Sequence, residues 1–235
     1  MPLPFFFIEA IPQDESFIPL NEQTSRHIVQ VLRMKIGGLL SLTDGKGNLL
    51  TCEITDEHKK KCVVKVQEAK HYSQSPRTIS IAISLLKHAN RFEWFIEKAT
   101  ELGIAEIIPA ICERTEKQHF RSDRMKNILT SAMLQSEQVW LPSLKEPTPL
   151  REIILHAHQS QKFIAHCMEG PKISLADAVN AYTASQMILI GPEGDFTSQE
   201  IDEGFKNHFI PVSLGQTRLR TETAGIVAAA ILTMQ

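Results

Sequence analysis

The sequence predicts an α/β fold, in which helices cover both faces of a mainly parallel sheet, preceded by a small domain of β-strands. Strand-like apolar runs alternate with helical segments from residue 78 to residue 235, and this alternation is typical of parallel sheets. Residues 1–72 instead carry short strand-like runs around a turn rich in glycine. With 235 residues, 43% of them hydrophobic, the chain is long enough to build a substantial core.

Residues 1–72 are expected to form the small β domain. The runs Leu39–Thr43 and Leu49–Ile54 are typical of strands, and they flank Asp44–Gly47, whose two glycines supply the positive φ that a tight hairpin needs. A third strand is predicted at Cys62–Val66. The stretch Ser73–Pro76 interrupts the strand and helix periodicities, which indicates a linker.

One helix is expected in this first domain, from Asn21 to Met34. Asn21 is the predicted N-cap, because its side chain can accept a hydrogen bond from a free backbone N–H of the first turn. The spacing of Ile28, Val31 and Leu32 predicts that they share one buried face.

Residues 77–235 are expected to form the α/β domain. Its predicted strands are residues 78–86, 106–111, 162–167, 186–190 and 210–214. The helix over residues 91–102 is expected to bury Phe92, Phe95, Ile96 and Ala99. Gly103 follows it at the C′ position, and Ser122 is the expected cap of the next helix. Thr197 and Glu200 have the spacing of a capping box, and Thr221 opens a final helix of small apolar residues.

The composition does not indicate a general nucleic-acid binder, a disulfide-bonded protein or a metalloprotein. A net charge of −2 does not indicate a general nucleic-acid binder, so an RNA surface would have to be a local patch. Such a patch could be built from basic residues of the middle third, although these could equally be solvated helix faces: Arg77, Lys87, Arg91, Arg114, Arg121, Arg124 and Lys126. The four cysteines are far apart and the histidines match no ligand spacing, so neither disulfides nor a metal is expected.

No targeting or membrane segment is expected either. The apolar run Phe5–Ile8 lacks a preceding basic region, and Glu9 follows it directly. The longest other apolar run, Ala224–Leu232, is too short to span a bilayer. The sequence therefore predicts a cytoplasmic location.

Two unusual loops predict a binding site at one edge of the sheet. In open α/β sheets, ligands bind beyond the carboxyl ends of the strands. Ile190 is followed there by Gly191–Phe196, whose two glycines allow a flat ligand to approach the backbone. Leu214 is followed by Gly215–Ala224, which places two arginines and a carboxylate around a helix start. A Gly-Pro turn alone is usually only a turn, but two such loops at neighbouring strand ends favour a ligand pocket.

The familiar nucleotide and hydrolase motifs do not occur. No G-x-G-x-x-G follows a predicted strand, and the chain contains neither a G-x-x-x-x-G-K-[ST] phosphate loop nor a G-x-S-x-G elbow.

The two loops resemble the hallmark stretches of the RsmE family of SPOUT methyltransferases. The resemblance rests on Leu189–Gly194, Leu214-Gly215 and Leu219–Ala224. It extends over nearly the whole chain through Lys98, Glu101–Gly103, Pro109, Arg114, His27, Val31–Arg33 and Asp44-Gly45. It implies an N-terminal PUA-like β-barrel that helps to hold RNA and a C-terminal SPOUT domain with a trefoil knot, a recognised exception to the rule against knots. It also implies a homodimer that uses S-adenosyl-L-methionine to methylate N3 of one uridine in the 16S ribosomal RNA of the small subunit.

The resemblance also assigns roles to individual residues. The implied cofactor-binding residues are His166, Met168, Glu169, Gly170, Ile190, Gly191, Pro192, Glu193, Gly194, Ser213, Leu214, Gly215, Leu219, Arg220, Thr221, Thr223 and Ala224. The implied RNA-binding residues are Arg26, His27, Arg33, Arg91, Lys98, Arg114 and Gln135.

The chemistry suggests catalytic roles for three residues. Uridine N3 carries a proton, so methylation requires its removal or stabilisation of the resulting negative charge. Arg220 is expected to stabilise charge on the uracil carbonyls, and Glu222 or Glu193 to accept the proton or orient the group that does. The alternative is that Arg220 and Glu222 form a structural ion pair at the start of the last helix.

The chain departs from the family pattern at three places. Asp195 stands where members usually have glycine, Gln216–Arg218 where they have Pro-Arg-Ile, and Gln138 where an arginine is common. Two other functions remain open: a SPOUT methyltransferase with another RNA target, and a catalytically silent RNA-binding assembly factor.

Overall fold

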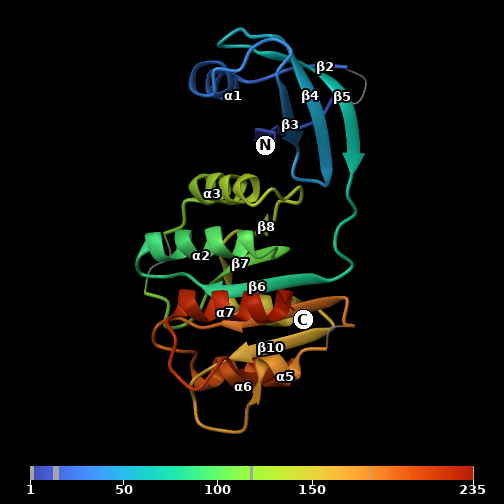
Figure 1. Cartoon of the computed structure of the whole chain (residues 1–235). Coiled ribbons are helices and arrows are strands. Elements are labelled where there is room, and N and C mark those ends of the chain that lie inside the picture. The colour runs from blue at the N-terminus through green and yellow to red at the C-terminus, as the bar shows by residue number, and fades with distance from the viewer. Residues whose placement is uncertain (1–2, 13–15, 117–118, 181, 235) are drawn as a thin grey trace. The chain divides into compact units, whose positions relative to one another are not determined.

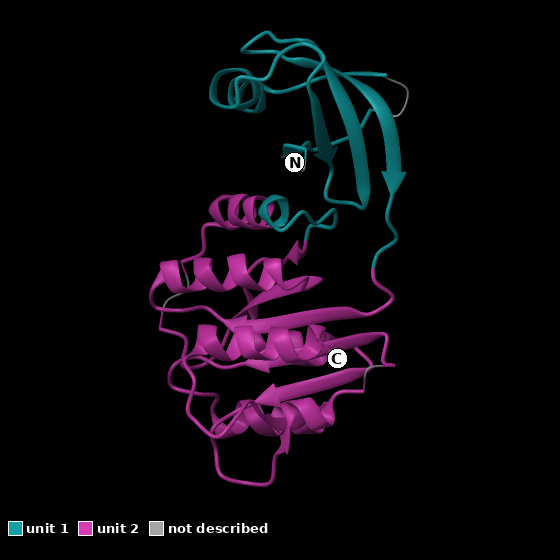
Figure 2. Ribbon diagram, in the orientation of Figure 1, with its two compact units in different colours: residues 1–74, 133–141 teal, residues 75–132, 142–235 magenta. Residues whose placement is uncertain are grey.

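The computed structural model describes residues 3–12, 16–116, 119–180 and 182–234. It divides into two compact units, shown in different colours in Figure 2. Unit 1 comprises residues 1–74 and 133–141, and unit 2 comprises residues 75–132 and 142–235. The stretch 133–141, expected from the sequence to belong with the α/β domain, is therefore part of the first unit.

Unit 1 is built on a five-stranded sheet with the order β1-β3-β4-β5-β2. Its strands are β1 Phe5–Phe7, β2 Phe17–Pro19, β3 Leu39–Thr43, β4 Asn48–Asp56 and β5 Val63–His71. The predicted hairpin is confirmed: β3 and β4 pair antiparallel, and Gly45 and Gly47 have φ values of 69° and 90°. β5 continues well beyond the predicted Cys62–Val66, because it follows the long partner β4.

The segment 133–141 is held against this hairpin. The N–H of Gly47 donates to the carbonyl of Val139, and the N–H of Leu141 donates to the carbonyl of Gly45. A Cβ on Gly47 would lie 2.6 Å from the Trp140 ring, so only glycine allows this close approach. These bonds explain why residues 133–141 cluster with unit 1.

The helical segment of unit 1 differs from the prediction. Asn21 is the N-cap as expected and accepts a hydrogen bond from the N–H of Thr24 at 2.8 Å. The helix then changes from the α-helix α1 Glu22–Arg26 to a π-helical turn, η1 His27–Val31, and ends there. Of the expected buried face only Ile28 is buried, whereas Val31 and Leu32 are 68% and 42% exposed. That prediction was wrong because a π turn holds more residues per turn than an α-helix, so Val31 no longer shares the face of Ile28. Leu32 lies beyond the π turn, as its C-cap.

Unit 2 contains an eight-stranded sheet with the order β11-β13-β10-β12-β6-β7-β8, and β9 also pairs with β7. All its strand pairs are parallel, as the alternating pattern predicts. The strands are β6 Thr78–Ser84, β7 Glu106–Ile111, β8 Ser143–Leu144, β9 Thr148–Pro149, β10 Gln161–Ala165, β11 Ile173–Ser174, β12 Ser185–Ile190 and β13 Ile210–Ser213. The five predicted strands are confirmed to within two residues, whereas β8, β9 and β11 are too short to show a periodicity.

The helices of the described chain beyond residue 75 are α2 Ala89–Glu101, α3 Ser122–Gln135, α4 Leu150–His156, α5 Leu175–Ala178, α6 Ser198–Lys206 and α7 Thr221–Thr233. The buried face predicted for α2 and the glycine that follows it, Gly103 with φ 80°, are confirmed. The capping box of Thr197 and Glu200 is confirmed as well. Ser122 is not a cap: it is the first helical residue, and its hydroxyl donates to the carboxylate of Glu146 at 2.8 Å.

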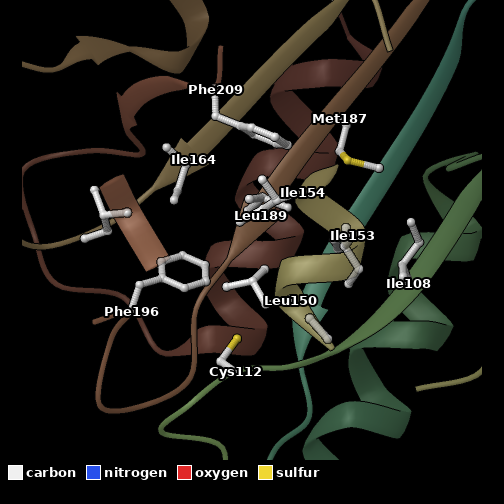
Figure 3. Close-up of a cluster of buried hydrophobic side chains, with 13 residues drawn as sticks. Ile108, Cys112, Leu150, Ile153, Ile154, Ile164, Met187, Leu189, Phe196 and Phe209 are labelled. Carbon is white, nitrogen blue, oxygen red and sulfur yellow. The ribbon is translucent and has the colours of Figure 1, made fainter. Parts of the chain in front are cut away.

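Two layers of helices cover the sheet of unit 2. Helices α2 and α7 lie side by side on one face (Figure 1), where Gly225 of α7 allows an approach so close that a Cβ there would lie 2.6 Å from the Phe95 ring and 2.9 Å from Ile83. Residues of α4 and α6 cover the other face and share a buried apolar cluster with the sheet, which includes Ile154, Leu189 and Phe196 (Figure 3). This packing fixes the N-terminal turn of α7 against the sheet edge.

The four cysteines are free thiols. Cys52, Cys62 and Cys112 are buried, and Cys167 is exposed. Within the described residues no group of histidine, cysteine and acidic side chains could hold a metal ion. No helix in the described ranges is long and apolar enough to cross a membrane.

Candidate functional site

Two adjoining cavities lie at the carboxyl edge of the unit 2 sheet. Parallel strands end at the same edge, so the loops after β10, β12 and β13 meet there. The cavities have volumes of about 340 and 330 Å³. Residues lining both of them are Ala165, Cys167, Arg218, Leu219 and Ala224. Together they have the size of a small-molecule site, which ordinarily measures about 300–1,000 Å³. We call them the first and the second cavity.

Most residues of the predicted cofactor set line these cavities. The first cavity is lined by Ile190, Gly191, Pro192, Glu193, Leu219, Arg220, Thr221 and Ala224. The second adds His166, Ser213, Leu214 and Gly215. Five members of the set are not in either wall: Met168, Glu169, Gly170, Gly194 and Thr223. Lining residues outside the set are Ala165, Cys167, Lys172, Asp195, Val212, Gln216, Thr217 and Arg218.

Asp195 joins two of the loops. One carboxylate oxygen accepts from the N–H of Cys167 at 2.8 Å, and the other accepts from the N–H of Phe196 at 2.9 Å. The φ of Asp195 is 64°, in the left-handed region that aspartate tolerates better than most residues with a side chain. This backbone conformation suits the glycine that the family resemblance leads us to expect at this position. The substitution to aspartate adds a clamp between the loops after β10 and β12.

The two glycines of the β12 loop have different surroundings. A Cβ on Gly191 would lie 3.1 Å from the Phe196 ring, so glycine keeps this part of the wall close to the core. A Cβ on Gly194 would be in ordinary contact with the Arg114 side chain at 3.4 Å. Arg114, an expected RNA contact, donates to the Gly194 carbonyl at 2.7 Å and so supports the loop from outside.

Arg91 holds both candidate catalytic carboxylates. Its Nε donates to Glu222 at 2.7 Å and one terminal nitrogen donates to the other Glu222 oxygen at 2.5 Å, while the second terminal nitrogen donates to Glu193 at 3.0 Å. Burial of Glu222 opposes its ionisation, but the Arg91 hydrogen bonds and a backbone hydrogen bond outweigh it, so the pKa of Glu222 lies below its ordinary value. Glu222 is therefore an anion with both oxygens bonded to Arg91.

Arg220, unlike Arg91, is not bonded to a carboxylate of the described residues. It is the N-cap residue of α7, and its exposed guanidinium forms no hydrogen bond or ion pair with any residue that the structure describes. The alternative of an Arg220–Glu222 ion pair is thus not the arrangement observed, because Arg91 occupies the carboxylate. Arg220 lines the first cavity and is available to a ligand.

His166 lies in the wall of the second cavity. Both of its ring nitrogens are buried without a hydrogen-bond partner among the described residues. Burial, reinforced by the nearby Lys172 and opposed by Asp195, lowers the pKa of His166, so the ring is neutral near pH 7. A neutral imidazole offers one donor and one acceptor, which suits a polar ligand in this cavity.

The other expected RNA-binding residues are distributed over both units. In unit 1, Arg26 pairs with Glu22, and exposed His27, Arg33 and Gln135 belong to the same unit. In unit 2, Lys98 is paired with Glu97 and Glu101. Several members of the possible basic patch also have acidic partners: Lys87 with Glu116, Arg124 with Glu93, and Arg91 as described above. These pairs weaken the patch as a continuous positive surface.

Comparison with known proteins identifies the family. A family model described as an RNA methyltransferase domain matches residues 73–233, and one described as an RNA methyltransferase PUA domain matches residues 20–67. A crystal structure of a probable rRNA-methyltransferase from Porphyromonas gingivalis is 35% identical, covers 97% of this chain and 95% of its own, and superposes with a TM-score of 0.90. The chain therefore belongs to the RNA methyltransferases.

Two further relatives indicate to which family of RNA methyltransferases the chain belongs. The ribosomal RNA small subunit methyltransferase E of Neisseria gonorrhoeae, whose structure is described as bound to S-adenosyl methionine, is 27% identical with a TM-score of 0.87 and covers 99% of this chain and 97% of its own. The protein of the same name from Rickettsia conorii is 28% identical, with coverage of 95% and 92%. The chain belongs to the ribosomal RNA small subunit methyltransferase E family, as the sequence motifs indicate.

Proposed function

We propose that this protein uses S-adenosyl-L-methionine to methylate N3 of one uridine in the 16S ribosomal RNA of the small subunit. The observation that carries the proposal is the paired cavity at the sheet edge, bordered by the free guanidinium of Arg220 and by the carboxylates that Arg91 holds. The names of the relatives support ribosomal RNA as the substrate and S-adenosyl methionine as the cofactor. The choice of uridine N3 rests on the family resemblance and on the chemistry of these side chains.

The residues present fit the cofactor. Two cavities that share a wall accommodate an elongated molecule bent between them, and the unpartnered ring nitrogens of His166 can bond its polar groups. Gly215 has φ 142°, and a Cβ placed on it would meet no heavy atom within 4 Å, so the backbone there is open to a ligand. When bound, the cofactor supplies the methyl group from its sulfonium. The protein supplies position and charge.

The contacts of the two carboxylates support different roles for them. Glu222 is a poor proton acceptor, because Arg91 occupies both of its oxygens and its pKa is lowered. We assign it the task of positioning Arg91. Glu193 shares only one oxygen with Arg91 and is partly exposed, so it is the better candidate to accept the N3 proton. Arg220 then stabilises the negative charge that develops on the uracil carbonyls.

The finer features of the fold are part of the same proposal. We assign residues 1–72 to a PUA-like barrel that holds RNA and residues 77–235 to a SPOUT domain whose last segment forms a trefoil knot. The match of a PUA family model to residues 20–67 supports the first assignment. We also assign a homodimer that forms through α7, which the small apolar residues of that helix support. A cytoplasmic location and a mechanism without a metal complete the proposal.

The substitution Arg220→Ala tests the catalytic assignment. Turnover should fall by about 100-fold or more, because charge stabilisation in the transition state is lost, while the affinity for S-adenosyl-L-methionine stays close to that of the wild type. Arg220→Lys should rescue turnover poorly, since an ammonium lacks the planar fork of a guanidinium. Arg151→Ala, an exposed arginine of α4, is the matched control.

Three measurements on each variant decide the matter: cofactor affinity by calorimetry, melting temperature, and turnover at saturating cofactor. Saturated turnover near the wild-type value in Arg220→Ala would remove Arg220 from the catalytic residues. Absence of cofactor binding by the wild-type protein would instead favour a silent RNA-binding assembly factor.

A further inference from the structure

A third cavity, of about 600 Å³, lies between the N-terminal turns of α2 and α7. Its lining residues are Asn90, Arg91, Trp94, Arg220, Glu222 and Thr223. It shares Arg220 with the first cavity, and the bonds from Arg91 to Glu193 and Glu222 link the walls of the two. A group bound in the third cavity would thus be a neighbour of a ligand in the first.

Trp94 gives this cavity an aromatic surface. The other aromatic residues of α2, Phe92 and Phe95, are buried in the core, whereas Trp94 is 43% exposed. A large aromatic side chain left in contact with solvent at a polar cavity is suited to stack on a flat ring. No described aromatic side chain forms a ring contact with Trp94, so no other ring already stacks on the part of it that lines the cavity.

Two polar side chains beside Trp94 are also free. Asn90 precedes Trp94 by four residues, so both side chains lie on one face of α2. The amide of Asn90, like the guanidinium of Arg220, forms no hydrogen bond with any part of the chain that the structure describes. An amide donates and accepts, and a guanidinium only donates. This combination matches the edge of a pyrimidine, which presents carbonyl acceptors and a ring N–H.

The charges of the cavity are compatible with RNA. Glu222 is the acidic residue in its wall, and Arg91 neutralises it through two hydrogen bonds. Arg220 adds a positive charge that forms no ion pair among the described residues. The cavity therefore does not repel the phosphates that flank a target nucleotide.

We propose that this cavity is the binding subsite for the target nucleotide, in which Trp94 stacks on the extruded pyrimidine base while Asn90 and Arg220 bond its polar edge. The inference rests on the proposed function, because an enzyme that modifies a ring nitrogen used in base pairing must take the base out of its stack. Trp94 then replaces part of the stacking that the base loses. The shared residue Arg220 places the base next to the cofactor cavity.

The test compares Trp94→Phe, Trp94→Leu and Trp94→Ala, with Tyr182→Ala as the control because Tyr182 is a fully exposed aromatic residue of the same unit outside the cavities. Loss of one stacked base should lower kcat/KM for small ribosomal subunits about 10- to 100-fold in Trp94→Ala. Trp94→Phe should keep most of the activity, and Trp94→Leu should resemble the alanine variant, because leucine fills the space without offering a π face. The dissociation constant for S-adenosyl-L-methionine should change less than twofold in all of them.

Fluorescence gives a second readout that needs no methyl transfer. The chain has two tryptophans, and a uridine-containing single-stranded RNA that stacks on Trp94 should quench indole emission in the wild type and in Trp140→Phe, but not in Trp94→Phe. Equal quenching in Trp94→Phe and the wild type, or unchanged kcat/KM in Trp94→Ala, would overturn the proposal. So would light scattering that shows Trp94→Ala as a monomer and the wild type as a dimer, since a second copy of the chain would then cover Trp94. Failure of the wild type to methylate would refute the proposed function, and the quenching would still decide the inference.

Discussion

Removal of the Asp195 clamp should loosen the cofactor site without unfolding the protein. In Asp195→Gly, the loop after β10 loses the hydrogen bond between the Cys167 N–H and a half-buried carboxylate at 2.8 Å. A hydrogen bond to a charged group contributes about 1.5–3 kcal/mol, less where solvent screens it. Glycine simultaneously relieves the left-handed backbone at φ 64°, which costs an ordinary residue about 1–2 kcal/mol. The Phe196 N–H also loses its bond to the same carboxylate, so the relief of the backbone offsets only part of the lost hydrogen bonding in the free energy of unfolding.

The loss of cofactor affinity has no compensating effect of this kind. Cys167 lines both cavities, so a free loop must be ordered again when the ligand binds. If about 1.4 kcal/mol of the clamp is spent on that ordering, the dissociation constant of S-adenosyl-L-methionine rises about tenfold. Asp195→Asn should weaken binding as well, because an amide has one acceptor oxygen where the two backbone N–H groups require two.

Calorimetry and thermal melting on the same preparations provide the assay. The control is Asp202→Asn on α6, an exposed aspartate away from the cavities. We expect weaker cofactor binding in both Asp195 variants and only a modest fall in the melting temperature of Asp195→Gly. Cofactor affinity within twofold of the wild type in both variants would refute the clamp.

At pH 8 a thiol reagent should modify Cys167 alone in the native protein, because burial raises the pKa of the Cys52 and Cys62 thiols to about 11 and that of the Cys112 thiol to about 12. Bound S-adenosyl-L-methionine should protect Cys167, which lines the first cavity. A second equivalent of label before unfolding would contradict this. Glu222→Gln should lower the melting temperature at pH 7, because the ionised Glu222 is bonded to Arg91. The difference from the wild type should shrink as the pH falls below the ordinary carboxyl pKa of 4.5, since a lowered pKa stabilises the native state only while the group is ionised. A constant difference down to pH 3 would be inconsistent with the Arg91 pair. Light scattering at micromolar concentration should give about twice the chain mass of 26.4 kDa, and the single-chain mass would exclude the homodimer.

The sequence predicted those parts of the fold that local patterns determine. The β3–β4 hairpin follows from two glycines between alternating strands, and the buried face of α2 follows from its period of 3.6 residues. The π turn at His27–Val31 and the two-residue strands could not be predicted, because a single turn or a residue pair has no periodicity. Their form depends on what they pack against.

In the candidate site, too, the features with a local sequence pattern could be predicted and those that depend on distant residues could not. The loops after β12 and β13 were predicted because parallel strands end at one edge and the glycines there are visible in the sequence. The pairing of Arg91 with Glu222 was missed, since the two residues lie 131 positions apart and no local signal connects them. Asp195 did leave a signal, as a non-glycine residue at a glycine position, but only the structure shows its bond to Cys167.

Mapping the methyl group in small-subunit RNA identifies the atom that the protein methylates. Small ribosomal subunits from a strain lacking this protein are incubated with it and labelled S-adenosyl-L-methionine, and the 16S RNA is then digested and analysed by mass spectrometry and by primer extension. We expect one methylated uridine that stops reverse transcription, because a methyl group at N3 blocks the pairing edge of the base. A methyl group on a ribose hydroxyl, which leaves that edge free, or label only in another RNA would contradict it.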